Sequence, residues 1–310
     1  MSVLGILQSS TDSKISIEDM HINYWHVSTP FSFRGIISAL LARKIDENFI
    51  DIGIRYRVTS GSINSIRLFH ASNSLFQDRA VDLSRHVLNE KTNDLIFGVN
   101  ATAHGTIVNY KFSGEEICFR VVPVTRSERI NSNETRIILD ATVGASEDWQ
   151  YCRFRIPFCA DTQMYSKKPW GRAKSGRIFN LSISDVRGSI EARNSSVHWR
   201  ENLVPIEHCF AFLIAPINYV PVLCSPIQHY TRLLEADVWK DYLSDGNALT
   251  VRSGSAIHQW RSGRLIDLNS PFRVHAHLHR EFGFGLVIGT ILLGLLGALL
   301  RWFGPSANGS

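Results

Sequence analysis

The sequence lacks the short motifs that mark common enzymes. It contains no G-x-S-x-G, no G-x-x-x-x-G-K, no helix-opening G-x-G-x-x-G and no H-E-x-x-H. A pair such as Cys159 and His104 suits a thiol nucleophile by residue type, but 12 histidines and 5 cysteines offer many such pairs by chance. We therefore expect no enzymatic activity, no catalytic residue and no cofactor.

Cysteine is scarce, and no two cysteines form a C-x-x-C pair. Zinc sites and disulfide frameworks normally show paired, regularly spaced cysteines, so this spacing predicts no metal site and favours buried thiols in a reducing compartment. The five cysteines are Cys118, Cys152, Cys159, Cys209 and Cys224.

The amino terminus lacks the features of a signal peptide. Residues 1–8 carry no basic region, and their apolar core is too short. Four N-x-S/T sequons, at Asn100, Asn133, Asn180 and Asn194, suit a glycosylated ectodomain instead. Because Asn180 lies inside an expected strand, we favour chance occurrence, with glycosylation as the alternative.

One long run contains no charged residue. It extends from 282 to 300 between Glu281 and Arg301. About twenty residues at roughly 1.5 Å each span a bilayer core of roughly 30 Å, and aromatic residues are favoured at its boundary. We expect residues 282–303 to form a membrane-inserting helix with the lipid bilayer as partner. Its expected lipid-facing residues are Phe282, Phe284, Leu286, Ile288, Ile291, Leu292, Leu295, Leu299 and Trp302.

Glycines within this run fit two behaviours. Gly285 and Gly289 form a G-x-x-x-G pair, which lets two helices pack closely and predicts an oligomeric anchor. Glycine also weakens a helix, which fits a peptide that moves from a sheltered state into a membrane. Both interpretations stay open, and only the short tail 304–310 follows the run.

The rest of the chain is patterned for β-structure. Apolar residues alternate with polar ones at 50–58, 65–70, 149–156, 177–184 and 208–214, and apolar or β-branched runs occupy 106–112, 117–124 and 136–143. About eight strands with Gly, Ser or Asn between them predict a mainly β fold, an antiparallel, jelly-roll-like β-sandwich. Short helices are expected at 33–45, 79–95 and 228–243.

The proline-rich stretch 216–226 suggests a domain boundary. We expect an N-terminal arm with a short helix (1–45), a β-sandwich domain (46–220), and a helix plus a small β module (221–281) before the membrane helix. The small module takes its short strands from 248–251, 256–260, 265–268 and 272–278.

Three histidines alternate along the stretch just before the uncharged run. His275, His277 and His279 share one face of an expected strand. Three imidazoles in a row are poor geometry for a metal but charge together between about pH 5 and 7, so they are candidate pH sensors. The alternative is three solvated histidines on an edge strand.

A basic segment surrounds Trp170. Lys167, Lys168, Arg172, Lys174 and Arg177 suit contact with phosphate groups, and the tryptophan suits stacking on a base or insertion at a lipid interface. The net charge of +5 also favours contact with anionic partners. The alternative is an exposed loop with solvated charges.

Three segments in order resemble jelly-roll capsid proteins of picorna-like viruses. The strand 50–58, the apolar-Pro-aromatic turn Ile156-Pro157-Phe158, and the closing strand with Phe210 and Phe212 before Pro216 follow the family's succession. The resemblance implies a structural virion subunit that forms oligomers, with the apolar terminus as a membrane-penetration segment at a virion or host membrane.

We thus expect a non-enzymatic structural protein, membrane-associated through its last helix. The alternative is a single-pass, tail-anchored protein whose β-domain lies in the cytosol and binds a protein or ligand partner.

Overall fold

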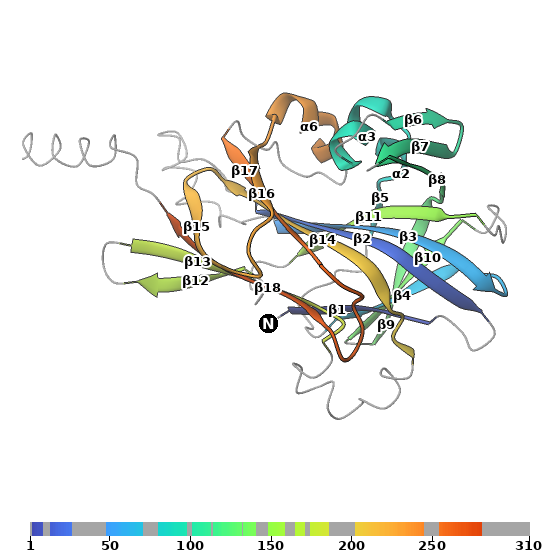
Figure 1. Ribbon diagram of the computed structural model, residues 1–310, viewed down its shortest axis with the longest axis horizontal. Helices are drawn as coiled ribbons and strands as arrows, with labels where there is room; N and C mark the ends of the chain where they lie inside the picture. Colours follow the sequence, from blue (N-terminus) through green and yellow to red (C-terminus); the bar gives the residue numbers. More distant parts are fainter. Residues whose placement is uncertain are drawn as a thin grey trace, which may run out of the picture.

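Two β-sheets and a helical cap form three layers in the computed structural model (Figure 1). Sheet A and sheet B face one another, and helices with a small hairpin cover the outer face of sheet B. The structure describes residues 2–8, 13–26, 48–70, 80–97, 101–112, 114–131, 133–140, 148–158, 165–170, 174–185, 202–244 and 254–280.

Sheet A contains eight strands among the described residues. Along its path they are β15 (Tyr219–Ser225), β18 (Phe272–Arg280), β13 (Lys174–Ile183), β1 (Ser2–Leu7), β4 (Ser65–His70), β10 (Glu134–Leu139) and β9 (Val124–Asn131), with β12 (Tyr165–Trp170) beside β13.

Sheet B contains ten strands in the described part of the chain. Its path is β16 (Tyr230–Leu233), β17 (Ser255–Arg261), β14 (Ile206–Pro216), β2 (Lys14–His26), β3 (Asn48–Ser60), β11 (Gln150–Phe158), β8 (Glu115–Val121), β7 (Ile107–Phe112) and β6 (Ala101–His104), with β5 (Val81–Asp82) beside β11.

The main core lies between the two sheets. The strands that line it contribute alternate residues, because successive side chains point to opposite faces. Sheet A supplies residues such as Ile66, Leu181 and Ala276, and sheet B supplies Ile52 and Phe154, all at most 1% exposed. The predicted mainly β, sandwich-like fold is therefore confirmed.

Most strand pairs among the described residues are antiparallel, as predicted, but three are parallel. Strand β1 runs parallel to β13, β2 runs parallel to β14, and β11 begins parallel to β8. Both amino-terminal strands enter the centres of their sheets, where they separate strands that would otherwise be neighbours. The sheets are consequently mixed.

The amino-terminal arm and the carboxy-terminal module are built into both sheets. Strand β2 is central in sheet B, although it lies in the expected arm 1–45. Strand β17 pairs with β14, and β18 pairs with β13. The stretch 216–226, expected as a boundary, contains β15. These pairings cross the predicted limits between the arm, the sandwich and the module.

The cap consists of α2 (Ser84–Val87), α3 (Glu90–Phe97), α6 (Ala236–Ser244) and the hairpin β6–β7. The helix expected over 79–95 is instead the short strand β5 and two separate helices. Only the second half of the helix expected over 228–243 forms, because residues 230–233 pair with β17. The helix expected over 33–45 lies outside the described residues.

Candidate functional site

The three histidines lie on the outer face of sheet A. Strand β18 turns Val274, Ala276 and Leu278 into the core, so the intervening His275, His277 and His279 occupy the opposite face, where they are partly exposed. We call these three residues the histidine face. Strand β18 pairs with β13 on one side and β15 on the other, so it is an interior strand and not the edge strand of the alternative.

Two of the histidines contact one another. His275 Nδ1 contacts Asn180 Oδ1 on β13, and its Nε2 lies 2.8 Å from Nε2 of His277. A hydrogen bond at this distance needs one N–H and one lone pair. Protonation of both imidazoles would place two N–H groups against one another, so the contact breaks when the second proton binds.

Charged and apolar groups surround the histidine face. Arg273 pairs with the buried Asp185 at 2.5 Å, and this carboxylate raises the pKa of the Arg273 guanidinium. On β15, Val220 lies opposite His279 and Leu223 lies opposite His277. Val220 is 36% exposed and Leu223 58%, so apolar and titratable groups alternate on one accessible surface.

The basic segment forms a hairpin and not a loop. Strands β12 and β13 pair antiparallel, with Lys168 opposite Gly176 and Trp170 opposite Lys174. Gly176 in turn lies opposite His279 on β18, so the backbone register brings Lys168 into line with the histidine face. Lys167 lies opposite Arg177, while Arg172 lies outside the described residues.

Residues 281–310 lie outside the described residues, including every position expected to insert into a membrane and the pair Gly285 and Gly289. Within the described ranges, no helix is long and apolar enough to cross a bilayer. Those ranges also contain no group of three or more His, Cys, Asp or Glu residues arranged to hold a metal ion.

A second candidate site, missed by the sequence pattern, lies beneath the cap on the outer face of sheet B. Strand β3 was expected to turn its polar residues to solvent, but Asp51 is 0% exposed. Its carboxylate accepts hydrogen bonds from Arg155 Nε (2.7 Å), Trp25 Nε1 (2.7 Å) and the Tyr242 hydroxyl (2.8 Å). Since Tyr242 belongs to α6, this cluster fastens the cap to the sheet.

Arg153 lies beside this cluster as a deeply buried cation. Its Nε donates to Tyr242 Oη (2.8 Å) and its Nη1 to Tyr151 Oη (3.1 Å), while Nη2 finds no hydrogen-bond partner among the described residues. Desolvation alone would lower the pKa of Arg153, but the neighbouring Tyr242, Tyr151 and Asp51 raise it, so the guanidinium stays charged.

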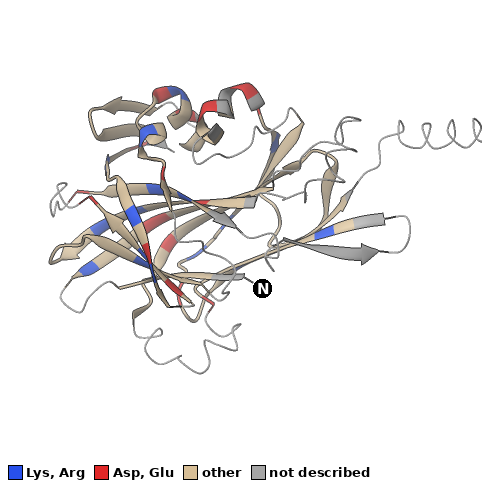
Figure 2. Ribbon diagram, turned by 180° about the vertical axis from the view of Figure 1, so that it is seen from behind, with Lys and Arg blue, Asp and Glu red and all other residues tan. Residues whose placement is uncertain are grey.

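A third group of charges lies where β2 and β3 meet. Arg55 donates to Asp19 (2.7 Å from Nε) and lies 2.7 Å from Glu18, while burial raises the pKa of Glu18. Figure 2 shows basic and acidic positions side by side on these strands as well as on the cap. Trp149 packs under Arg55, with 5.4 Å between the guanidinium carbon and the ring centroid.

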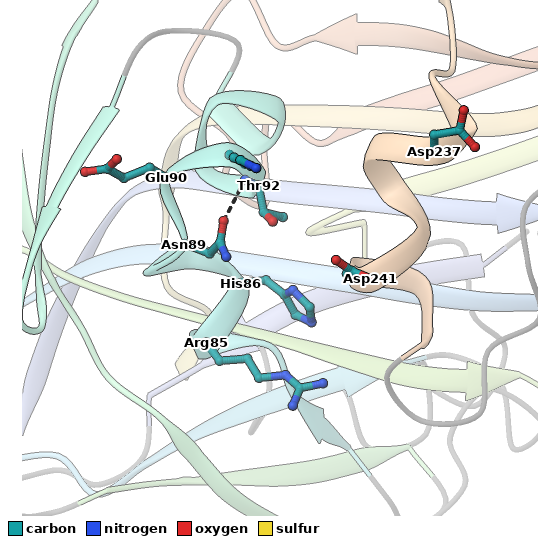
Figure 3. Close-up of a pocket in the computed structure, with 8 residues that line it drawn as sticks. Arg85, His86, Asn89, Glu90, Thr92, Asp237 and Asp241 are labelled. Carbon is teal, nitrogen blue, oxygen red and sulfur yellow. Dashed lines mark hydrogen bonds between the residues drawn. The ribbon is translucent and has the colours of Figure 1, made fainter.

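A polar cleft of about 1060 Å³ separates α2 and α3 from α6 (Figure 3). His86 and Arg85 enter it from one side and Asp241 from the other. The His86 ring packs on Tyr242 with centroids 5.0 Å apart, and burial lowers its pKa to about 4. The imidazole is therefore neutral near pH 7, while Glu90, Asp237 and Asp241 bring carboxylates to the lining of the cleft.

Two smaller predictions can be checked directly. Cys152 and Cys209 are buried as expected, whereas Cys118 is exposed. The sequon residue Asn133 is buried and donates from Nδ2 to the His70 carbonyl (3.1 Å), so its amide nitrogen is occupied in the folded chain.

Comparisons of the chain with models of known protein families and with curated proteins found no match.

Proposed function

We propose that this chain is a non-enzymatic structural protein that associates with lipid bilayers through residues 282–303, with the histidine face beside the membrane. The supporting observation is contiguity: β18 ends at Arg280, and the uncharged run begins at Phe282. The histidines, the exposed Val220 and Leu223, and the basic hairpin lie on or beside β18, the strand that directly precedes the apolar run in the sequence. Cationic and apolar groups together suit an anionic membrane surface.

Acidification should strengthen this association. Histidine side chains gain charge between about pH 5 and 7, and a second proton on the His275–His277 pair breaks their contact. The charged groups beside the histidine face are Arg273 and its partner Asp185, and the backbone register places Lys168 in line with His279.

Vesicle leakage tests the proposal. Full-length protein should release dye from phosphatidylserine-containing vesicles far more at about pH 5 than at about pH 7, and His275→Gln with His277→Gln should remove most of that difference. Equal leakage at both pH values would oppose the histidine role. Membrane-bound protein that resists alkaline carbonate extraction without any prior acidification would favour the permanent tail anchor.

A second proposal, that the chain is a subunit of a capsid-like assembly, has one supporting observation. Most of the exposed large apolar residues in the described ranges lie in one segment that contains the edge strands β15 and β16. Exposed apolar edges of this kind normally become covered by other subunits. These residues are Ile217, Val220, Val222, Leu223, Ile227, Tyr230 and Leu233.

Light scattering tests assembly. Purified protein should form particles or oligomers, and Leu223→Lys with Leu233→Lys should return it to monomers. A protein that stays monomeric at all concentrations would remove the capsid proposal while leaving membrane association in place.

A further inference from the structure

A second cavity, of about 490 Å³, lies on the outer face of sheet B at the other end of the cap. Its floor is formed by β2, β14, β16 and β17, and its wall by α3 and the β7–β8 hairpin. The volume lies within the roughly 300–1,000 Å³ usual for small-molecule sites. We call it the sheet B cavity.

Aromatic side chains line much of this cavity. Phe210 and Phe212 lie on its floor, Tyr230 at one margin, and Phe97 and Tyr110 on the wall. Phe97 and Tyr110 stack on one another with ring centroids 5.1 Å apart, so the wall is aromatic as well as the floor. Such surfaces suit a planar ring.

His21 closes the floor between the aromatic residues. Its ring lies 5.1 Å from that of Phe210, and burial lowers its pKa to about 4. The imidazole is thus neutral near pH 7 and adds another flat, uncharged ring to the site.

One residue that lines the cavity has an unsatisfied hydrogen-bond acceptor. Gln259 is only 6% exposed, and its Oε1 is buried without a hydrogen-bond partner among the described residues. A buried acceptor of this kind favours a ligand that donates an N–H or O–H to it. A side-chain amide offers both donors and an acceptor, which matches the edge of a nucleobase.

Charges divide the sheet B cavity into two ends. At one end Glu18 and Asp19 are already paired with Arg55. Beside Gln259, on the same face of β17, Arg261 packs over Phe210 with 5.2 Å between the guanidinium carbon and the ring centroid. Arg55 offsets only one of these two carboxylates, so this end keeps a negative charge. An anion is therefore favoured at the other end, next to Arg261, the amide and the aromatic floor.

We propose that the sheet B cavity binds a nucleobase carrying a phosphate, with the ring against Phe210 and Tyr230, its edge on Gln259 and its phosphate at Arg261. A simple aromatic carboxylate would satisfy the aromatic floor and Arg261 but leave Gln259 Oε1 unpaired. Sites built around a buried polar group discriminate strongly against such ligands. The same chemistry is offered by a free nucleotide and by single-stranded RNA.

Calorimetric titration of the full-length chain tests this assignment. The ligands are the four nucleoside 5′-monophosphates, their nucleosides, ribose 5-phosphate, indole-3-acetate and a single-stranded tetranucleotide. At least one monophosphate should bind at least tenfold more tightly than ribose 5-phosphate and indole-3-acetate. Tighter binding of the tetranucleotide would identify RNA as the source, and tighter binding of the monophosphate a free nucleotide.

Two variants separate the contacts. Gln259→Leu should weaken nucleoside and monophosphate alike by roughly 10- to 100-fold. Arg261→Gln should weaken only the monophosphate, by about tenfold. The control Arg136→Gln removes an exposed arginine on sheet A and should change nothing.

If a variant does not fold, the ligand series on the unmodified protein still tests whether the sheet B cavity binds a nucleotide. Failure of every nucleotide to bind below about 1 mM, equal binding of indole-3-acetate, or nucleotide binding that survives both substitutions would each overturn the assignment. Membrane association could persist in all three cases, because it rests on other residues.

Discussion

We expect the hydroxyl of Tyr242 to make the main stabilising contact between the cap and sheet B. A substitution that removes only this oxygen tests the expectation. The hydroxyl accepts from Arg153 Nε and donates to Asp51 Oδ2, each at 2.8 Å, with both partners charged and buried. Hydrogen bonds to charged groups contribute roughly 1.5–3 kcal/mol each, and the two are not additive. Tyr242→Phe should therefore lower the free energy of unfolding by about 2–4 kcal/mol.

Tyr56 provides a matched control within the same sheet. It is also 0% exposed, but its hydroxyl has no hydrogen-bond partner in the described part of the chain. Tyr56→Phe removes the same atom and should be neutral or slightly stabilising. Urea unfolding followed by tryptophan fluorescence measures both, since Trp239 lies in α6 with its ring 5.1 Å from that of Tyr242. Equal unfolding free energies for the two variants would refute the fastening role.

Three further outcomes are expected. Asp51→Asn leaves a buried guanidinium without its counter-charge and should destabilise the fold by about 3–5 kcal/mol in the same urea assay. Gly53→Ala would place a Cβ 2.0 Å from the Tyr151 hydroxyl and should cost about 1–3 kcal/mol, whereas Gly263→Ala, with nothing within 4 Å, should be neutral. Burial lowers the pKa of His258 to about 4 in the folded chain. As the pH falls from about 6.5 towards 4, His258 therefore becomes protonated in the unfolded chain but not in the folded one, and the folded state loses stability. His258→Asn should remove about 1.4 kcal/mol per pH unit from that slope, which urea titrations across this range would detect.

Regular alternation of apolar and polar residues made several strands predictable, whereas a β-bulge concealed β2, which is 13 residues long. Strands β3, β4 and β13 were expected nearly where they lie, because one face of each is uniformly apolar. In β2, Ile15 and Ile17 face the core, but the register shifts before Met20 and Ile22 do the same. The extra residue breaks the period of two, so the sequence pattern does not reveal a central strand.

The covered face of sheet B could not be inferred from pattern for a different reason. Asp51, Arg153 and Arg155 alternate with apolar residues as if they faced solvent. Their burial depends on α6, which is distant in sequence. In the sequence pattern, a polar residue that is buried beneath another element cannot be told apart from one that is exposed to solvent. The sheet B cavity could not be predicted for the same reason, because its lining residues come from elements that are distant in sequence. The histidine face was predicted because its three residues are close in sequence.

The central claim is that residues 282–303 prefer lipid to water, and vesicle flotation at about pH 5 tests it most directly. Leu292→Lys places a charge in the middle of the uncharged run, while Leu265→Lys adds the same charge to a leucine that is 48% exposed on the body of the protein. The wild-type chain and Leu265→Lys should float with anionic vesicles, and Leu292→Lys should stay in the soluble fraction. Flotation of all three to the same extent would contradict the claim.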